Sequence, residues 1–257
     1  MKYNTDINII GSIPDYNLIY RALPLLISDP KELEKILVDD NEFDFRTEKS
    51  RKRFLAVLKS AFLNIDNIEF NELIATLIDN RKNDQNSQSL ILFWVFNLQN
   101  KLFRELNESI YLNYYFQGRV ELPKEDVVAY IKDLISRTPE LKEKWSVLTI
   151  DTIASKYLTI LKKLNLVEGV NKKKISYVHL TDEMIAVYIH ILDYLKTKKT
   201  NFLEDDFLSF SFIEKSDILE RLKKVAKKDW INMNYAGNSL QVNGVFTSKT
   251  IIDGLYR

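Results

Sequence analysis

The sequence predicts a mostly α-helical protein with three parts: a helical bundle over residues 1–118, a winged helix-turn-helix over 119–180, and C-terminal helices with a β-hairpin over 181–257. The 257 residues include only 6 Gly and 5 Pro, too few chain breakers for an all-β protein with many tight turns. Hydrophobic residues make up 46% and charged residues 28%, so the chain can bury a core and lacks the composition of a disordered segment. Apolar residues recur at three- and four-residue spacing, which is typical of amphipathic helices.

Successive amphipathic helices are expected within the first 118 residues. Each is marked by a capping residue or a Pro at its start, followed by an apolar stripe. The expected helices start at Ser12–Asp15, Asp29-Pro30, Thr47-Glu48 and Asn67, and two more cover Leu90–Leu102 and Phe103–Phe116. The polar stretch Asn80–Ser89 is expected to be a loop, and Gly118 to cap the last of these helices in the left-handed conformation.

Residues 119–180 have the element order of a winged helix-turn-helix. A first helix is expected to begin within Leu122–Asp126, a short second helix to cover Pro139–Trp145, and Thr149 to cap a longer third helix. A short hairpin is expected to follow, with β-like residues at Ile175–Val178. In such a module the third helix is the one that enters the major groove of DNA.

The C-terminal segment is expected to contain more helices and one clear hairpin. A helix is predicted from Thr181 or Asp182 to about Lys196, and a basic helix over Lys215–Lys228. Residues 230–235 and 239–242 flank Ala236-Gly237-Asn238, which is the pattern of a β-hairpin. A last short helix is expected over Thr247–Leu255.

Positive charge is concentrated in one stretch of a chain whose net charge is only +1. Residues 1–118 carry 14 Lys and Arg against 17 Asp and Glu, whereas residues 119–257 carry 23 against 19. Within the second part, residues 142–174 hold eight Lys against three acidic residues. This distribution predicts one surface that faces a polyanion, on a protein that is not cationic overall.

The third helix and the hairpin carry the candidate DNA contacts. Ser and Thr hydroxyls can bond to phosphates or base edges, and Lys neutralises phosphate charge. The candidate contacts are Thr149, Thr152, Ser155, Lys156, Thr159, Lys162 and Lys163 on the helix and Lys172, Lys173 and Lys174 in the wing. No Arg lies between Arg137 and Arg221, so bidentate Arg–guanine contacts are absent from this element and little sequence preference is expected. The alternative is a set of solvated lysines on a module that packs on the N-terminal domain or binds a protein.

A second basic group lies at the start of the expected third N-terminal helix. Arg51, Lys52 and Arg53 are consecutive there, with Arg46 and Lys49 nearby. They could form a second contact with the DNA backbone. The alternative, which we favour from the sequence alone, is a solvated first helical turn.

Few features of the sequence point to an enzyme. There is no Cys, and His179 and His190 lack a second metal-ligand pattern, so both are expected to be structural. The acidic residues Asp39-Asp40 and Glu204–Asp206 lie in expected loops without an organised Lys or His, and no Gly-rich phosphate loop is present. We therefore expect no catalytic residues, no bound metal and no cofactor.

No segment has the pattern of a membrane anchor or an export signal. The longest apolar run is Leu90–Phe96, far short of the roughly 18–20 residues that cross a bilayer. The opening Met1–Asp6 lacks the charged-then-apolar pattern of a signal peptide. We expect a cytoplasmic protein.

The sequence resembles the BrxA family of BREX bacteriophage-defence systems over most of its length. The resemblance lies in Ile10–Ile13, in the basic helix Glu48–Leu58 and, above all, in Trp145–Thr149 continuing through Leu164–Gly169. It implies an N-terminal domain similar to the NusB antitermination fold, no catalytic activity, and binding to double-stranded DNA. It also implies work beside other BREX proteins, among them a methyltransferase and an ATPase.

One departure from the family pattern is that Lys rather than Arg dominates the expected DNA face. It leaves open whether the winged helix, the Arg51–Arg53 region, or a groove between them makes the main contact. The sequence thus predicts a non-enzymatic BREX component that binds double-stranded DNA mainly through phosphates.

Two alternative functions remain: a protein-interaction adaptor within a defence complex, and an RNA-binding protein, which only the NusB analogy suggests. Buried Trp145, Tyr157 and Tyr177 would favour DNA binding, whereas their clustering on the surface would favour the adaptor. The oligomeric state, the DNA sequence preference and the identity of the protein partner stay open.

Overall fold

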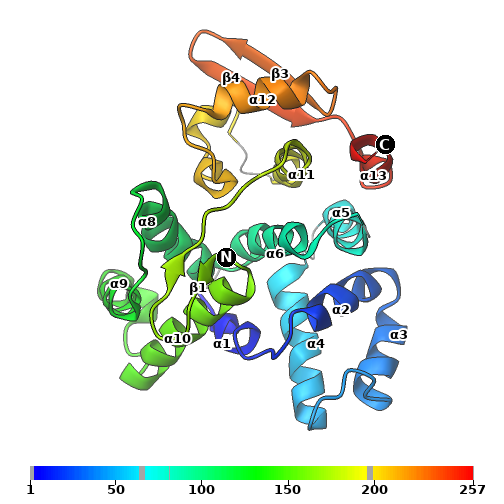
Figure 1. The fold of residues 1–257 in the computed structure, drawn as a ribbon. Coiled ribbons are helices and arrows are strands. Elements are labelled where there is room, and N and C mark those ends of the chain that lie inside the picture. Colours follow the sequence, from blue (N-terminus) through cyan, green and yellow to red (C-terminus); the bar gives the residue numbers. More distant parts are fainter. Residues whose placement is uncertain (1–2, 64–66, 81, 196–198, 257) are drawn as a thin grey trace. The chain divides into compact units, whose positions relative to one another are not determined.

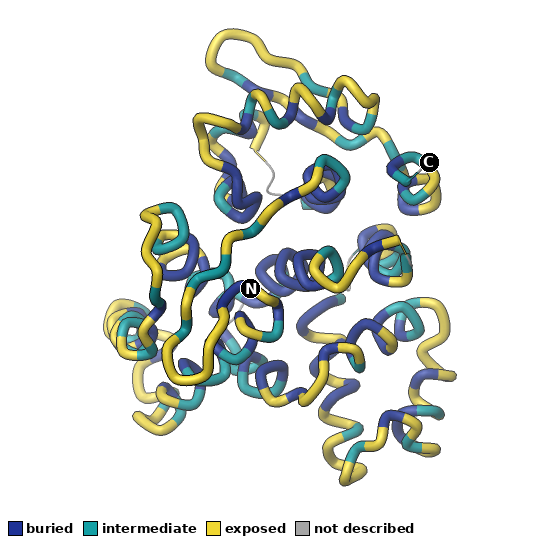
Figure 2. The backbone as a smooth tube through the Cα atoms, viewed as in Figure 1, coloured by how far each residue is buried: buried dark blue, intermediate teal, exposed yellow. Residues whose placement is uncertain are grey.

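A computed structural model describes residues 3–63, 67–80, 82–195 and 199–256 (Figure 1). Within these residues the chain is mostly α-helical, and its strands form two small antiparallel sheets of two strands each. The mostly α fold class that the sequence predicts is therefore confirmed. Figure 2 shows the buried residues running along the inner faces of the helices and the exposed residues gathering in loops and hairpin tips.

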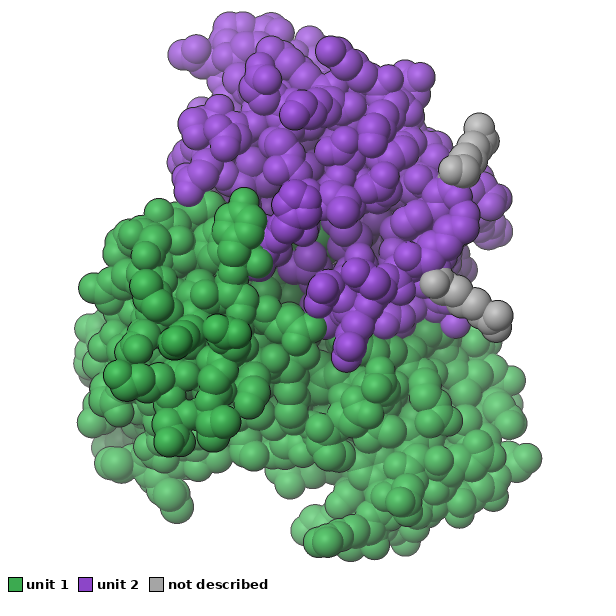
Figure 3. All heavy atoms as spheres, viewed as in Figure 1, with its two compact units in different colours: residues 1–63, 92–177 green, residues 64–91, 178–257 purple. Residues whose placement is uncertain are grey.

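The chain divides into two compact units (Figure 3). Unit 1 consists of residues 1–63 and 92–177, and unit 2 of residues 64–91 and 178–257. Each unit therefore takes two separate pieces of the sequence. The segment expected to be a winged helix-turn-helix lies in the same unit as the first N-terminal helices. The division into residues 1–118, 119–180 and 181–257 stays a prediction about which parts of the chain fold as modules. A truncated chain can test it.

Unit 1 begins with helices whose starts are fixed by capping side chains. Asp29 accepts a hydrogen bond from the backbone N–H of Glu32, and Thr47 accepts one from that of Ser50, at the two starts the sequence predicts. The elements are α1 (Asp6–Ile10), α2 (Asn17–Ser28), α3 (Pro30–Glu34), a π-helical turn (Lys35–Asp39) and α4 (Glu48–Phe62). Helix α1 was not predicted, because five residues are too few to show a helical period.

Helix α6 (Gln85–Gln99) starts earlier than the sequence predicts. Asp84 accepts a hydrogen bond of 2.8 Å from the backbone N–H of Ser87, which caps a first turn made of polar residues. The prediction of a loop over Asn80–Ser89 is therefore wrong from Gln85 onward. From Leu90 to Leu98 every residue of this helix is buried, so the apolar run belongs to a core helix.

The next helix break also differs from the prediction. It falls at Asn100, whose side chain accepts a hydrogen bond of 2.8 Å from the N–H of Phe103, and not between Leu102 and Phe103. The following elements are α7 (Lys101–Leu106), a π-helical turn (Asn107–Tyr111) and α8 (Leu112–Phe116). Gly118 follows with a φ of +68°, in the left-handed conformation expected of it.

The remaining part of unit 1 is a helix pair followed by a small hairpin. Its elements are α9 (Lys124–Arg137), a 3-10 turn (Pro139–Leu141), α10 (Val147–Lys163), β1 (Val167–Glu168) and β2 (Lys174–Ile175). The strands pair antiparallel, and Glu121 bridges to Lys174 on the other side of β2. This bridge ties the start of α9 to the hairpin.

Three details of this region correct the sequence predictions. Only a 3-10 turn replaces the expected helix over Pro139–Trp145, because Glu143 has a left-handed φ of +59° that a helix cannot contain. The residue that caps α10 is Ser146 and not Thr149. The side chain of Ser146 accepts a hydrogen bond of 3.2 Å from the backbone N–H of Thr149. Strand β2 ends at Ile175 and does not extend to Val178.

Unit 2 combines helices with the longer hairpin. Its elements beside the first part of α6 are α5 (Ile68–Asp79), α11 (Asp182–Asp193), two 3-10 turns (Phe202–Glu204 and Leu208–Ser211), α12 (Ile218–Ala226), β3 (Ile231–Ala236), β4 (Ser239–Gly244) and α13 (Ile251–Leu255). The predicted hairpin is confirmed, and its turn uses Gly237 at a φ of +60°, which L-residues adopt with strain. Helices α12 and α13 are shorter than expected. The predicted helix end at Lys196 lies outside the described residues.

Candidate nucleic-acid interface

Helix α10 packs against the end of α1 along its C-terminal half. Gly11 lies so close that a Cβ atom added there would be 2.8 Å from both the Cβ and the carbonyl oxygen of Lys156. The ammonium of Lys163 donates to the carbonyl oxygens of Gly11, at 3.2 Å, and of Ile13. Burial lowers the pKa of Lys163, and repulsion from the charge of Lys156 lowers it further. Lys163 thus holds α10 to α1, and the half-buried Lys156 lies at the same contact.

The hydroxyl groups predicted to contact DNA bond to their own helix. Thr152, Ser155 and Thr159 each donate to the carbonyl four residues earlier, at 2.8, 2.9 and 2.8 Å. The Oγ1 of Thr149 lies 3.0 Å from the Oγ of its cap, Ser146. A hydroxyl has one proton, and in Thr152, Ser155 and Thr159 that proton is used in the bond to the helix backbone. These three hydroxyls can therefore still accept a hydrogen bond but cannot donate one to DNA. Phosphate oxygens need donors, and the lysines are the donors that remain.

The wing lysines have three different roles. Lys172 is 77% exposed at its side chain and lies 3.6 Å from the carboxylate of Glu121. Lys173 donates to the carbonyl oxygens of Gly169, at 3.1 Å, and of Val170, so it closes the hairpin turn. Lys174 is exposed. It forms a β-bridge with Glu121 through the backbone, and this bridge does not use the ammonium group, which can therefore contact a phosphate.

Lys162 at the end of α10 lies close enough to Lys173 before β2 for their charges to interact. Burial and, after it, repulsion from Lys162 lower the pKa of Lys173. Lys162 is exposed, and no ion pair joins it to any residue that the structure describes. We call Lys162, Lys172, Lys173 and Lys174 the helix–hairpin surface. Of the predicted contacts, the fold brings Lys162 near Lys173, and Lys172 and Lys174 are the chain neighbours of Lys173, while Lys163 is used in packing.

The second basic group does not act as a unit, because consecutive helical residues point in different directions. Arg51 donates to the carbonyl oxygen of Val38. Lys52 forms an ion pair with Glu48 at 2.5 Å. Arg53 lines a cavity of about 470 Å³ together with Arg46. The sequence does not reveal this cavity, because its walls come from two segments, residues 8–14 and 44–54, that only the fold brings together.

The aromatic residues chosen to separate DNA binding from an adaptor role behave differently from one another. Tyr157 is fully buried, Trp145 is half-buried, and Tyr177 is 83% exposed and stacks on Tyr115. Unit 1 also exposes the large apolar residues Val120, Val147, Leu148 and Val170. Apolar groups therefore accompany the lysines in this region.

A family model for BrxA matches residues 19–190, which is more than half of the chain. The chain belongs to the BrxA family. The match includes α10 and the whole helix–hairpin surface, together with Arg46 and Arg53. No curated protein matches the chain.

Membership of the BrxA family indicates a component of BREX phage-defence systems, as the sequence resemblance implied. BrxA is not a known family of enzymes. Among the residues that the structure describes, no helix is both long enough and apolar enough to span a membrane.

The two histidines of this BrxA chain differ in their surroundings. His190 is buried: its Nδ1 lies 2.7 Å from the carbonyl oxygen of Ala186, and its Nε2 accepts the N–H of Phe246 at 3.0 Å. Both ring nitrogens are therefore used in holding unit 2 together. His179 is exposed. In the described part of the chain, no three His, Asp or Glu side chains are grouped as metal ligands would be.

The acidic pairs noted in the sequence also have structural surroundings. Asp39 and Asp40 are exposed at the end of a π-helical turn. Asp205 accepts the backbone N–H groups of Lys199 and Phe207 at 2.8 and 2.9 Å, and Asp206 forms an ion pair with Lys199. The carboxylate of Asp205 thus fixes a loop.

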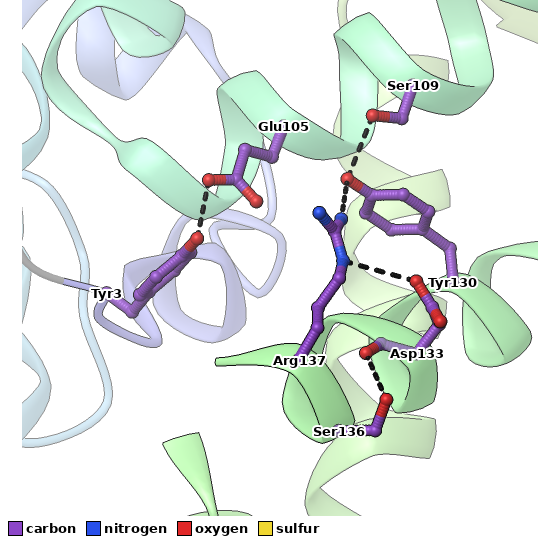
Figure 4. Close-up of polar contacts among 7 residues, drawn as sticks. All are labelled: Tyr3, Glu105, Ser109, Tyr130, Asp133, Ser136 and Arg137. Atoms are coloured by element: carbon purple, nitrogen blue, oxygen red, sulfur yellow. Dashed lines mark hydrogen bonds and ion pairs between the residues drawn. The ribbon is translucent and has the colours of Figure 1, made fainter. Parts of the chain in front are cut away.

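A polar cluster in unit 1 contains several titratable groups (Figure 4). Arg137 donates to the hydroxyl of Tyr130 at 2.9 Å and pairs with Asp133 at 3.2 Å, while Tyr3 donates to Glu105. Burial and the bond to Glu105 raise the pKa of Tyr3, which keeps this phenol protonated. A nucleophile or base needs the opposite shift. The cluster ties Tyr3 to α7 through Glu105, and it ties the π-helical turn to α9 through the 2.8 Å bond from Ser109 to Tyr130.

Proposed function

We propose that this BrxA protein is a non-enzymatic component that binds double-stranded DNA, mainly through phosphate contacts from the helix–hairpin surface. The observation that carries the proposal is the proximity of Lys162 on a long helix to Lys173, which stands between two exposed lysines in the hairpin. Lysines act as point charges toward phosphates and carry no base preference. We interpret α9, the 3-10 turn, α10 and the hairpin as a winged helix-turn-helix with a reduced second helix.

The hydrogen bonding of α10 argues for backbone contacts over base readout. Its hydroxyl protons are occupied, and Asp151 lies on the same helix in an ion pair with Lys124 at 2.6 Å. No Arg is present on α10 or the hairpin to bond a guanine edge. We therefore expect an affinity that varies little with DNA sequence and depends strongly on salt.

The test is the binding of a labelled 30-base-pair random-sequence duplex at several salt concentrations, with an RNA duplex of the same length beside it. Each phosphate contact contributes about 0.9 to the slope of log affinity against log salt. Replacing Lys172, Lys173 and Lys174 with Ala should weaken binding to all sequences alike and should flatten this slope.

A matched control removes the same charge elsewhere. Lys223, Lys224 and Lys227 are exposed on or next to α12 in unit 2, and their triple Ala variant should bind DNA as the native protein does. Equal losses in both triple variants would point to general charge attraction and would remove the helix–hairpin surface from the proposal. Absence of binding even at low salt would overturn it.

The second candidate function is an adaptor that docks onto another BREX protein, such as the methyltransferase or the ATPase. The exposure of Val147 and Leu148, 75% and 76%, at the start of α10 favours it. Replacing both with Ser would weaken a protein contact, while lysine replacements on the helix–hairpin surface would weaken DNA binding. RNA binding through a NusB-like N-terminal domain is tested by the RNA duplex.

A further inference from the structure

A cavity in unit 1 lies between the end of α1 and the start of α4. Its volume of about 470 Å³ falls within the range of sites for small molecules. One wall is the segment Ser12–Pro14, and the other includes Phe45, Arg46 and Arg53.

Arg46 and Arg53 line this cavity, and neither has a side-chain partner among the described residues. No ion pair or hydrogen bond joins the side chain of Arg46 or Arg53 to another residue in the described part of the chain. Asp44 is the one acidic residue in the wall, so the lining carries a net charge of +1. Arg binds phosphate in a bidentate way, and the positive end of the 15-residue helix α4 adds to the attraction for an anion.

The backbone of Phe45, which carries the aromatic wall of the cavity, is held in place by hydrogen bonds. The side-chain amide of Asn41 donates to the carbonyl oxygen of Phe45 and accepts its N–H, both at 3.0 Å. The ring of Phe45 lies 5.0 Å from that of Phe54. Phe45 is half-buried, so part of this fixed side chain remains open to contact. A fixed aromatic ring is a suitable stacking surface for a planar heterocycle.

The cavity lining also contains an acceptor for hydrogen bonds. Asp44 is exposed, and it lines the cavity beside Phe45 and Arg46. A carboxylate accepts hydrogen bonds from N–H and O–H groups. The lining therefore favours a ligand with donors as well as an anionic group.

We propose that this cavity binds a nucleoside 5′-phosphate, either as a free nucleotide or as the 5′-terminal unit of a strand. Arg46 and Arg53 bind the phosphate, Phe45 contacts the base, and Asp44 accepts hydrogen bonds from the base or the sugar. A nucleotide is the ligand class that unites these three chemistries. The inference is independent of the helix–hairpin surface, whose lysines lie elsewhere in unit 1.

The experiment is calorimetric titration of the full-length protein with each of the four nucleoside 5′-monophosphates. Adenosine and inorganic phosphate are the controls for the base and the phosphate alone. A duplex with a 5′-phosphorylated single-stranded tail, compared with the same duplex lacking the phosphate, distinguishes a strand end from a free nucleotide. Arg46→Ala and Arg53→Ala are the test variants. Lys52→Ala is the matched control, because Lys52 neighbours Arg53 but is paired with Glu48 outside the cavity.

Saturable binding of a nucleotide or of the phosphorylated tail, weakened about tenfold or more in both Arg variants and unchanged in Lys52→Ala, would support the proposal. Circular dichroism should show native helix content in the Arg variants, because both side chains are exposed. Absence of binding by every probe would overturn the proposal. So would inorganic phosphate binding as tightly as the nucleotides, or equal weakening in all three variants.

Discussion

Single polar residues inside unit 1 have a large effect on how its helices fit together. Asn107, fully buried at the start of a π-helical turn, donates to the Oδ1 of Asn97 and to the carbonyl oxygen of Phe103, both at 2.8 Å. It also accepts the hydroxyl proton of Tyr157 at 3.0 Å. Three helical segments are thus joined through one amide, and every donor and acceptor of that amide has a partner.

Removing the hydroxyl of Tyr157 tests this network. Tyr157→Phe keeps the ring but leaves the Oδ1 of Asn107 buried with no donor, which should lower the free energy of unfolding by about 1–3 kcal/mol. Urea denaturation followed by circular dichroism measures the loss. The control is Tyr177→Phe, at an exposed position, which should change stability by no more than about 0.5 kcal/mol. Equal effects at the two positions would contradict the role of the network.

The C-terminal Tyr256 gives unit 2 a pH-dependent contact. It donates to the Oδ1 of Asn83, and burial together with the nearby Glu183 raises its pKa from 10.0 to about 12. A phenol with a raised pKa in the folded state stabilises the fold below its unfolded pKa, and this contribution is lost as the pH rises through the folded value.

We therefore expect the native protein to lose stability more steeply than Tyr256→Phe between about pH 10 and about pH 12. Below this window the native protein should be the more stable of the two, because Phe cannot donate to Asn83. Urea denaturation at a series of alkaline pH values measures both effects. If the free energies of unfolding of the two proteins change with pH in parallel over the whole range, the ionisation of the Tyr256 phenol is not coupled to folding.

At the scale of elements, capping decides where α10 begins and so which residues open the proposed recognition helix. Ser146 is extended and accepts the N–H of Thr149, so the first turn contains the exposed Val147 and Leu148. Sequence patterning placed the cap three residues later, because both Ser146 and Thr149 are good capping residues. The backbone conformation distinguishes the two residues, because Ser146 is extended and Thr149 already lies inside the helix.

Replacing each residue in turn distinguishes the two caps. Ser146→Ala should lower the free energy of unfolding by about 1 kcal/mol, through the loss of the bond to the N–H of Thr149. Thr149→Ala, the control, should cost less, since the Thr149 hydroxyl bonds to that of Ser146 and to no other group in the described part of the chain. Thermal unfolding of both variants gives the comparison, and a larger loss in Thr149→Ala would restore the sequence-based prediction.

At the scale of the whole molecule, the two units interleave along the chain. Unit 2 uses residues 64–91 as well as 178–257, and helix α5 from the first piece packs on α11 from the second. The ring of Phe70 in α5 lies 6.2 Å from that of Tyr194, directly after α11. Neither piece of unit 2 has its full core without the other.

A truncated chain of residues 1–177 tests this interleaving. It lacks α11, so the face of α5 that carries Phe70, Leu73 and Leu77 would be exposed. We expect the fragment to bind a hydrophobic dye and to melt over a broader range than the full chain. If it instead unfolds cooperatively with unchanged helix content per residue, the modules predicted from the sequence, ending at 118 and 180, are the correct folding units.

Much of the fold could be predicted from local patterns. Capping residues such as Thr47 and Asn67 and the apolar stripes behind them mark α4 and α5, because both signals depend on near neighbours in the sequence. The failures have equally local causes: α1 is too short for a period, and the polar first turn of α6 has the composition of a loop. The cavity beside Arg53 could not be predicted, because its two walls are distant in sequence.

The sequence by itself determined the mostly α class, the hairpin in unit 2, the concentration of lysine in residues 142–174 and the likeness to BrxA. Only the tertiary structure decided which lysines are available to a polyanion. Lys162 and Lys163 are neighbours of the same type, yet successive helical side chains point about 100° apart. The segment directly after helix α1, more than a hundred residues away in sequence, binds the ammonium of Lys163 through the carbonyl oxygens of Gly11 and Ile13, whereas Lys162 stays exposed beside the hairpin.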